Sequence, residues 1–245
     1  MFSNLGNSAM TSLRSTTIPV SDPAAGLRIT EIFYSLQGEA NAAGLPTVFI
    51  RLTGCPLRCT YCDTTYSFEG GERLSLDEII NTALSYKTPY ICVTGGEPLA
   101  QPNCLILLSR LSDLGCQVSL ETSGTLDVSK VDPRVSKVLD LKTPTSGEEK
   151  RNLLSNLDYL TQHDQIKFVI CNHEDYIWSK QQVVEYQLEK KVSTVWFSPA
   201  FAVEKGAVKL PQLARDLAQW ILDDHLPVRF QLQLHKLLWN DETGR

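Results

Sequence analysis

The chain has 245 residues, of which 42% are hydrophobic and 21% are charged, and its formal net charge is −5. Such a composition is typical of a globular protein and leaves enough apolar material for one large domain or two small ones. The net negative charge gives no indication of a positively charged surface, which argues against nucleic acid as the main ligand. Because no stretch approaches about 20 consecutive apolar residues, no membrane span is predicted.

Residues 1–26 are expected to form a flexible N-terminal extension. The segment is rich in Ser, Thr and Pro, its only basic residue is Arg14, and no apolar run follows, which argues against a secretory signal. The chain contains seven cysteines. An odd count in a chain without an export signal indicates a metal or redox role rather than a disulfide framework, and it predicts a reducing, cytoplasmic location.

Short apolar runs alternate with amphipathic stretches along the rest of the chain. The runs predict strands at residues 48–52, 90–93, 117–120, 137–140, 165–170, 195–197 and 228–234. The amphipathic stretches predict helices at residues 76–86, 105–114, 152–160, 176–190 and 210–222. Ser75 and Glu78 have the spacing of a capping box before the first helix, and Gly115 is expected to end the second.

Strands that alternate with helices predict parallel βαβ units. Six or seven strands are fewer than the eight of a closed TIM barrel. We therefore expect a single α/β domain over residues 27–245, built as an incomplete, open TIM-like barrel rather than a doubly wound sheet. The polar and glycine-rich segments directly follow the strands, and in parallel α/β folds that edge of the sheet is where binding sites form.

Cys55, Cys59 and Cys62 form a CxxxCxxC loop after the first of these strands. This spacing lets one tight loop direct three thiolates to a single point, and thiolates favour iron–sulfur clusters and zinc. An ordinary cluster takes four cysteines, so here one iron would stay open to another ligand. The alternative is a structural zinc site completed by a distant histidine: His163, His173, His225 or His235. Four further cysteines lie in apolar runs and are expected to be buried: Cys92, Cys104, Cys116 and Cys171.

The cysteine loop resembles the signature of the radical S-adenosylmethionine (SAM) superfamily, and residues 95–98 (GGEP) resemble the motif that follows its second strand. The resemblance implies a radical SAM fold with a [4Fe–4S] cluster on the three cysteines and SAM on the open iron. The cofactor would then yield a 5′-deoxyadenosyl radical, and Glu97 would accept from the SAM ammonium. The implied SAM contacts are Tyr61, Asp63, Gly96, Glu97, Ser123, Asp140, Lys142, Ser198 and Pro199.

Residues 27–239 are more narrowly similar to the 7-carboxy-7-deazaguanine synthase family. The similarity rests on Leu36-Gln37-Gly38-Glu39 and on Arg51, four residues before the first cysteine. It implies that 6-carboxy-5,6,7,8-tetrahydropterin is contracted to 7-carboxy-7-deazaguanine with release of ammonia, in queuosine or 7-deazapurine biosynthesis. The implied substrate contacts are Leu36, Gln37, Gly38, Glu39, Arg51, Thr94 and His235. The usual LQGEG motif is broken, because Ala40 replaces its last glycine.

The same resemblance implies that Arg51 pairs with the substrate carboxylate and that Thr64 ligates Mg²⁺ beside it. A carboxylate partner suits Arg51, because no acidic residue lies in its own strand. The resemblance also implies a homodimer and an external electron donor. Two alternatives stay open: a glycyl-radical activating enzyme, which shares the Asp-Leu-Lys segment at 140–142 but acts on a partner protein, and a non-catalytic, zinc-stabilised binding module.

Overall fold

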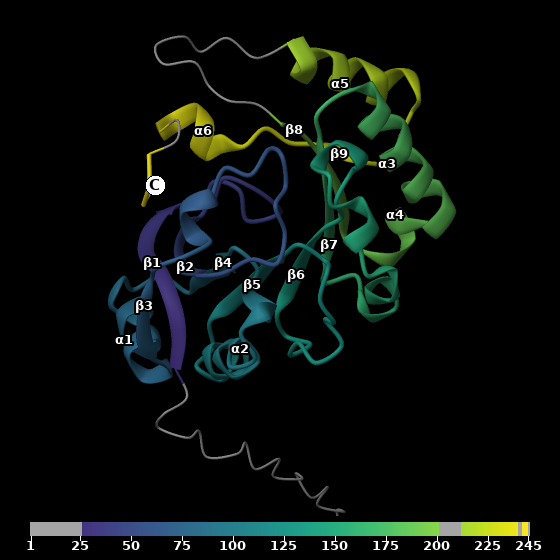
Figure 1. The fold of residues 1–245 in the computed structure, drawn as a ribbon. Helices are drawn as coiled ribbons and strands as arrows, with labels where there is room; N and C mark the ends of the chain where they lie inside the picture. The colour runs from purple at the N-terminus through teal and green to yellow at the C-terminus, as the bar shows by residue number, and fades with distance from the viewer. Residues whose placement is uncertain (1–25, 201–211, 240–241, 245) are drawn as a thin grey trace, which may run out of the picture.

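The computed structural model describes residues 26–200, 212–239 and 242–244. The expected N-terminal extension, apart from Gly26, lies outside the described residues. Within them, nine strands form one sheet in the order β3-β1-β2-β4-β5-β6-β7-β8-β9 (Figure 1). The strands are β1 (Gly26–Leu36), β2 (Pro46–Leu52), β3 (Glu72–Ser75), β4 (Tyr90–Gly95), β5 (Gln117–Thr122), β6 (Ser136–Asp140), β7 (Gln165–Ile170), β8 (Thr194–Pro199) and β9 (Arg229–Phe230).

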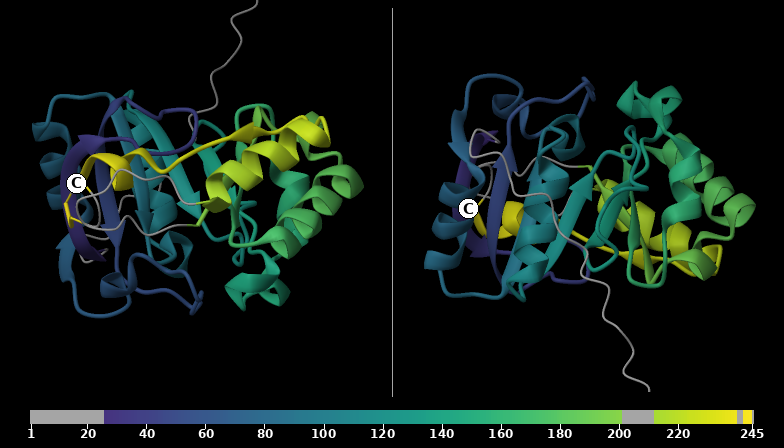
Figure 2. Two further views of the ribbon diagram at one scale, coloured as in Figure 1. Left: turned by 90° about the horizontal axis from the view of Figure 1, so that it is seen from above. Right: turned by 90° about the horizontal axis from the view of Figure 1, so that it is seen from below.

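The strands from β2 through β4 to β9 pair in parallel, and β1 and β3 add to the β2 edge in antiparallel orientation. The two end strands, β3 and β9, do not pair with each other, so the barrel is open. This arrangement confirms the predicted fold class. Around the outside of the curved sheet lie α1 (Leu76–Ser85), α2 (Cys104–Asp113), α3 (His173–Tyr186), α4 (Leu188–Lys191) and α5 (Gln212–Asp223) (Figure 2). Helix α6 (Leu234–Trp239) lies apart from them, above β1 and β2 in Figure 1.

Strand β7 illustrates how the sheet separates core from site. Successive side chains of a strand point to opposite faces. Ile166, Phe168 and Ile170 join the hydrophobic core, whereas Lys167 and Val169 line the interior cavity. All six residues of β7 are buried, because one face packs under the helices and the other lies inside the barrel.

The local signals for helix α1 and for the end of α2 are confirmed. The Ser75 hydroxyl accepts from the backbone N–H of Glu78, and the Glu78 carboxylate accepts from the backbone N–H of Ser75 at 2.8 Å. Four apolar residues of α1 face the core: Leu76, Ile79, Ile80 and Ala83. After α2, Gly115 adopts a φ of 80°, as a residue that ends a helix in the left-handed region does.

One predicted element is wrong in type, and two others differ in their bounds. The helix expected at 152–160 is a 3₁₀ segment, Leu154–Tyr159, since the buried Asn156 side chain bonds to the backbone of residues 124, 126 and 128 instead of facing away from a helix. The helix expected at 176–190 begins at His173 and is interrupted at Gln187, whose φ is 49°. The strand expected at 228–234 is reduced to Arg229–Phe230. Strands β1 and β3 were not predicted.

Two segments cross the open side of the barrel. The loop between β1 and β2 reaches β7, where the backbone N–H of Asn41 donates to Gln165 Oε1 at 2.8 Å. The segment between β9 and α6 runs over the carboxyl ends of the strands, from the β8–β9 side to the β1–β2 side (Figures 1 and 2). The two segments meet, because the backbone N–H of Leu234 donates to Gly38 O at 3.0 Å. They therefore close the gap that the sheet leaves.

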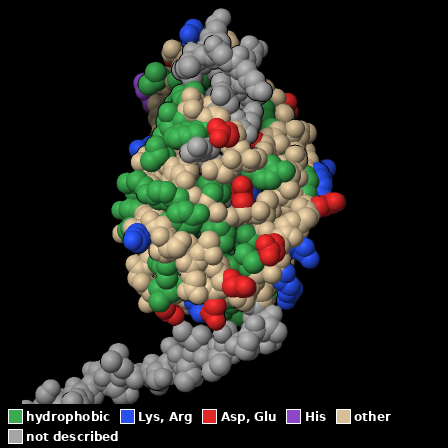
Figure 3. All heavy atoms as spheres, turned by 90° about the vertical axis from the view of Figure 1, so that its left-hand side faces the viewer, with side chains coloured by type: hydrophobic (Ala, Val, Ile, Leu, Met, Phe, Trp, Pro, Cys, Tyr) green, Lys and Arg blue, Asp and Glu red, His purple; other side chains and the backbone are tan. Residues whose placement is uncertain are grey.

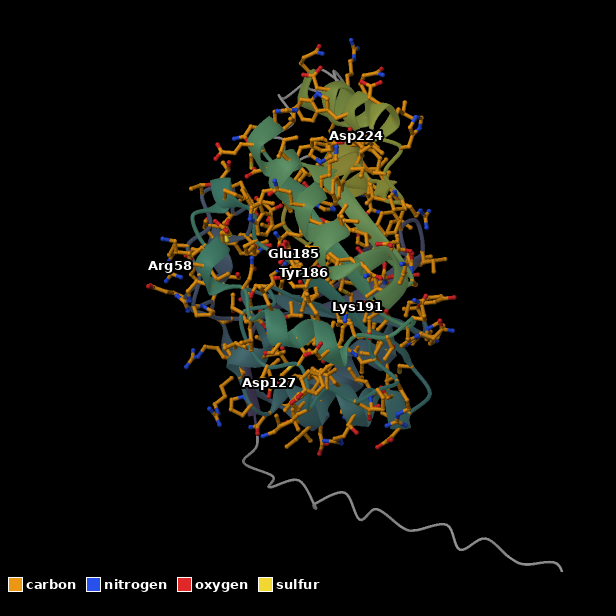
Figure 4. All side chains as sticks on the ribbon, turned by 90° about the vertical axis from the view of Figure 1, so that its right-hand side faces the viewer. Arg58, Asp127, Glu185, Tyr186, Lys191 and Asp224 are labelled. Carbon is orange, nitrogen blue, oxygen red and sulfur yellow. The ribbon has the colours of Figure 1, made fainter. Side chains whose placement is uncertain are left out.

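The outer surface divides into two kinds of face. Helices α3 and α4 cover one side of the sheet, with Glu185, Tyr186 and Lys191 over it and Arg58 at its rim (Figure 4). On the opposite side, exposed Tyr34 of β1 stacks on exposed Tyr86 at the end of α1, with ring centroids 5.7 Å apart. Figure 3 shows hydrophobic side chains gathered on that side. No helix in the described ranges is long and apolar enough to cross a membrane.

Candidate active site

A cavity of about 770 Å³ lies at the carboxyl ends of the parallel strands. All seven predicted substrate contacts line it: Leu36, Gln37, Gly38, Glu39, Arg51, Thr94 and His235. The predicted cluster and metal ligands also line it: Cys55, Cys59, Cys62 and Thr64. Of the predicted SAM contacts, six line it: Tyr61, Asp63, Gly96, Ser123, Asp140 and Lys142. The fold thus brings the cysteine loop, the segment at residues 36–39 and the residues that follow the later strands together in one chamber.

The cysteine loop forms one wall of the cavity. Its three thiols are free and partly buried, and the backbone N–H of Cys62 donates to Cys59 O at 3.2 Å. Burial raises the pKa of Cys55 and raises that of Cys59 to about 11, so a metal would have to displace protons from these thiols. Among the described residues, no three His, Cys, Asp or Glu side chains are gathered closely enough to hold a metal ion in this arrangement.

The wall next to the cysteines carries unsatisfied polar atoms. Asp140 Oδ1 and the Tyr61 hydroxyl are buried without a hydrogen-bond partner, although Asp140 Oδ2 pairs with Lys142 Nζ at 3.0 Å. Orphaned buried polar atoms are costly and mark places where a ligand completes the bonding. Gly96 packs against the cysteine loop so closely that a Cβ there would lie 2.3 Å from Gly54 O. These features fit a polar ligand such as SAM.

Glu97 lies behind this wall rather than in the cavity. Its carboxylate is fully buried and accepts from the Thr122 hydroxyl at 2.9 Å, from the backbone N–H of Leu99 at 3.0 Å, and from both the N–H and the hydroxyl of Ser123 at 2.7 and 2.5 Å. Glu97 thereby orients Ser123, which lines the cavity. The direct contact between Glu97 and SAM that the motif implied stays a prediction.

Ser198 and Pro199 end strand β8 and are also absent from the lining residues. The Ser198 hydroxyl is buried without a hydrogen-bond partner. Neighbouring Ala200 does line the cavity. The adenine-side backbone contact that the resemblance implied at Ser198 and Pro199 stays a prediction.

The cavity also holds a buried pair of opposite charges that sequence reasoning missed. Glu39 and Lys167, which are 8% and 9% exposed, form a salt bridge, and Gln233 Nε2 donates to Glu39 Oε1 at 2.7 Å. Burial alone would raise the pKa of Glu39, but the positive charge of Lys167, with His235 and the Gln233 bond, lowers it to about 2. Lys167 lies within an otherwise apolar strand, and a lysine there is unusual unless it is paired. This position was the sequence feature that could have indicated the buried pair.

Glu121 forms a second polar group in the cavity. It accepts from Gln37 Nε2 and from the Thr94 hydroxyl, both at 3.2 Å. Burial, followed by the negative charge of Glu39, raises the pKa of Glu121. A carboxyl group held this way can accept from, or when protonated donate to, a heterocycle edge. Glu121 lies two residues before the predicted SAM contact Ser123, but no substrate role was predicted for it.

Arg51 has an acidic partner, Glu31, on the neighbouring strand β1. The sequence prediction considered only the strand that contains Arg51, so this partner was not expected. Its Nε donates to Glu31 Oε1 at 2.7 Å, and the Tyr66 hydroxyl donates to the same oxygen at 2.8 Å. The register of β1 and β2 places Glu31 directly opposite Arg51. Nη1 and Nη2 of Arg51 make no hydrogen bond to the described residues, so these two donors remain for a carboxylate.

Thr64 and Asp63 lie where the cysteine loop meets the C-terminal segment. Cys62 Sγ and Thr64 Oγ1 are 3.8 Å apart, and Asp63 Oδ2 pairs with Lys236 Nζ of α6 at 3.0 Å. Burial would raise the pKa of Asp63, but Lys236 outweighs it and lowers that pKa. The Thr64 hydroxyl thus lies beside the Cys62 thiol, and Thr64 lines the cavity.

The profile of the radical SAM superfamily matches residues 49–142, the part that carries the cysteine loop, Gly96 and Asp140. The chain is also 43% identical to the 7-carboxy-7-deazaguanine synthase of Chlorobaculum tepidum over 222 residues, which cover 89% of this chain and 97% of that protein. It is 43% identical to the synthase of Koribacter versatilis over 223 residues, with coverage of 89% and 99%. The chain is therefore a radical SAM protein.

Within that superfamily, the chain belongs to the 7-carboxy-7-deazaguanine synthase family. The crystal structure of QueE from Escherichia coli has the same fold, with a TM-score of 0.68 at 22% identity and coverage of 86% of this chain and 95% of that one. Membership implies a [4Fe–4S] cluster and SAM as cofactors. The cavity offers three thiols and adjacent unsatisfied polar atoms for them.

Proposed function

We propose that this protein converts 6-carboxy-5,6,7,8-tetrahydropterin to 7-carboxy-7-deazaguanine with release of ammonia. The observation that carries the proposal is the set of groups that line one cavity. They are three thiols, the unsatisfied polar atoms of Tyr61 and Asp140, and Arg51, whose Nη1 and Nη2 make no hydrogen bond to the described residues, together with polar side chains such as Gln37, Thr94 and Glu121. The names of the relatives agree with this substrate class.

The cofactors would be held by the residues already described. Cys55, Cys59 and Cys62 would ligate the cluster. When bound, the cluster and SAM supply a radical that removes a hydrogen atom from the substrate. The remaining contacts to SAM would come from Tyr61, Gly96, Ser123, Asp140 and Lys142, with Asp63 nearby, with Glu97 acting through Ser123, and with the strand end at Ser198 and Pro199.

Other lining residues would recognise the carboxypterin by charge and by hydrogen bonds. Arg51 Nη1 and Nη2 suit a carboxylate in bidentate geometry, and desolvation inside the cavity strengthens that pairing. Gln37, Glu121 and Thr94 offer donors and acceptors to the edge of a pterin ring. The backbone of Leu36 and Gly38, with Glu39 and His235, would complete the enclosure.

We further propose Mg²⁺ at Thr64. Magnesium prefers oxygen ligands and keeps several non-protein ligands, so one hydroxyl beside a substrate carboxylate is a suitable site. The ion would neutralise charge on that carboxylate as the ring rearranges.

The partners and location are proposed on related grounds. An external reductant has to supply the electron that the cluster needs. Seven free thiols suit a reducing compartment, which supports a cytoplasmic location. The exposed apolar face around Tyr34 and Tyr86 supports a homodimer, which sedimentation would reveal by a doubled mass. One domain spanning residues 27–245 remains our proposal.

The test is anaerobic incubation of the reconstituted protein with SAM, reductant, Mg²⁺ and the carboxypterin, with the product read by mass. We expect 7-carboxy-7-deazaguanine from the wild type. Arg51→Lys keeps the charge but loses the two-donor fork, so its turnover should fall while its cluster absorbance stays unchanged. Arg110→Lys, which alters a surface salt bridge to Asp77, is the matched control.

Three results would contradict the proposal. Stoichiometric zinc without iron would indicate the zinc-stabilised module. Cleavage of SAM without any conversion of the carboxypterin would indicate another substrate. Full turnover by Arg51→Ala would place the substrate carboxylate elsewhere.

A further inference from the structure

Gln231 binds both backbone polar groups of Ala40, in the loop that carries the predicted substrate contacts. The backbone N–H of Ala40 donates to Gln231 Oε1 at 2.7 Å, and Gln231 Nε2 donates back to Ala40 O at 3.2 Å. The two residues are 191 positions apart in the sequence. Gln231 is 8% exposed, so both bonds are shielded from water. A primary amide that satisfies both polar groups of one residue fixes its orientation as well as its position.

The next residues of the same segment hold the preceding residues of the loop. Gln233 Nε2 donates to Glu39 Oε1 at 2.7 Å, and the backbone N–H of Leu234 donates to Gly38 O at 3.0 Å. The His235 ring packs on Gly38 so closely that a Cβ at residue 38 would lie 2.2 Å from His235 Nδ1. Residues 38, 39 and 40 are therefore each held by residues 231–235, which are the segment between β9 and α6 and the first two residues of α6.

The loop needs this support for two physical reasons. It crosses the open side of the barrel, where no neighbouring strand offers a ladder of backbone bonds. In addition, Ala40 has a φ of 59°, a left-handed conformation that costs a residue with a side chain about 1–2 kcal/mol. Such a conformation persists only where the surroundings over-determine it.

We propose that Gln231 and Gln233 are positioning residues for the substrate: they fix the backbone at Gly38 and Ala40 and the carboxylate of Glu39 in the cavity. The proposal rests on the proposed function for its catalytic consequence. Gln231 acts on the substrate through the loop and is not among the lining residues. Without these bonds the loop adopts several arrangements, and the substrate is held less firmly against the cofactor.

The experiment uses Gln231→Met and Gln233→Met in the reconstituted full-length protein. Methionine keeps the length of the side chain and removes its hydrogen bonds. Gln219→Met is the matched control, because Gln219 is exposed on α5 and bonds only within that helix region, to Asp223. Three quantities are measured: hydrogen exchange of the backbone at 37–45, the KM for the carboxypterin, and the ratio of 5′-deoxyadenosine to product. Cluster absorbance and the KM for SAM report on folding.

For Gln231→Met we expect faster exchange at 37–45, a KM for the carboxypterin about tenfold higher, equal to about 1.4 kcal/mol, and more 5′-deoxyadenosine per product. The KM for SAM and the cluster absorbance should match the wild type. Exchange and KM that equal those of Gln219→Met would overturn the proposal, as would loss of the cluster together with activity, which would mean a general structural role. If the wild type forms no product, the proposed function fails, and the exchange result alone then decides whether Gln231 holds the loop.

Discussion

Replacing Lys167 with methionine should strip Glu39 of its counter-charge and reverse the way in which this site responds to pH. In the wild type the pKa of Glu39 is about 2, below its usual value of 4.5. A depressed pKa stabilises the fold above pH 4.5, and that stabilisation is lost as the pH falls toward 2. In Lys167→Met, burial is left as the main influence, so the pKa of Glu39 should rise above its value in the unfolded chain. Stability should then decrease as the pH rises through that new pKa.

The magnitude follows from the burial of the pair. Glu39 and Lys167 are 8% and 9% exposed, and removal of one partner from a buried ion pair costs about 3–5 kcal/mol. The matched control is Lys180→Met, because Lys180 pairs with Asp224 at 2.7 Å but both side chains are about one-third exposed. Exposed pairs contribute about 0–1 kcal/mol, so this variant should lose little.

The assay is urea unfolding of the cluster-loaded protein under anaerobic conditions, followed by circular dichroism at pH 6 and pH 8.5. Lys167→Met should be much less stable than Lys180→Met at pH 8.5, and should regain part of the loss at pH 6 as Glu39 takes up a proton. The double variant Lys167→Met/Glu39→Gln should recover most of the stability at pH 8.5, since no buried charge remains. If Lys167→Met and Lys180→Met unfold alike, or if the double variant is no better than the single one, the reasoning about this pair is refuted.

Three further outcomes are expected. Cys59→Ala should prevent anaerobic reconstitution with about four irons and four sulfides per chain, as measured by iron and sulfide analysis. Cys104 is buried in the core, so Cys104→Ala should still take up the cluster. A full cluster in Cys59→Ala would contradict the proposed ligand set. Thr64→Ala should blunt the rise of activity with added Mg²⁺ and leave the cluster absorbance intact, and a response equal to that of the wild type would place the metal elsewhere. Ala40→Gly should raise the free energy of unfolding by roughly 0.5–1 kcal/mol. Glycine avoids the cost of the left-handed conformation at a φ of 59°, and this gain is only partly offset because glycine loses more conformational entropy on folding. A urea midpoint below that of the wild type would contradict this prediction.

Much of the fold could be predicted from the sequence, because its signals are local. Burial on both faces makes parallel strands read as apolar runs, and six of the seven predicted strands lie at β2 and β4 to β8. The capping box at Ser75 and Glu78 depends on residues three positions apart, and the structure has it as predicted. The strand predicted at 228–234 is shorter in the structure because Gln231 and Gln233 alternate with leucine for a different reason: they face the loop at Ala40 and Glu39, not a neighbouring strand.

The sequence by itself determined which chemistry the chain can carry. The spacing of Cys55, Cys59 and Cys62 and the order of the later motifs are properties of the linear chain. The cysteine loop and the motifs after β4, β5 and β6 follow parallel strands, so their place at one edge of the sheet is also determined. Residues 36–39 lie at and after the end of the antiparallel strand β1, so this rule does not determine their place. Most of the predicted site residues line this chamber, and only Glu97, Ser198 and Pro199 do not.

Only the tertiary structure decided how the charges inside that chamber are paired. Lys167 meets Glu39 across 128 positions, Gln231 meets Ala40 across 191, and Glu31 reaches Arg51 through an antiparallel strand that no pattern announced. Periodicity reports which face of an element is apolar, but it carries no information about which distant element supplies the partner of a buried polar group. The identity of that partner depends on the register and curvature of the whole sheet. For the same reason, only the tertiary structure decided that Arg51 is paired with Glu31.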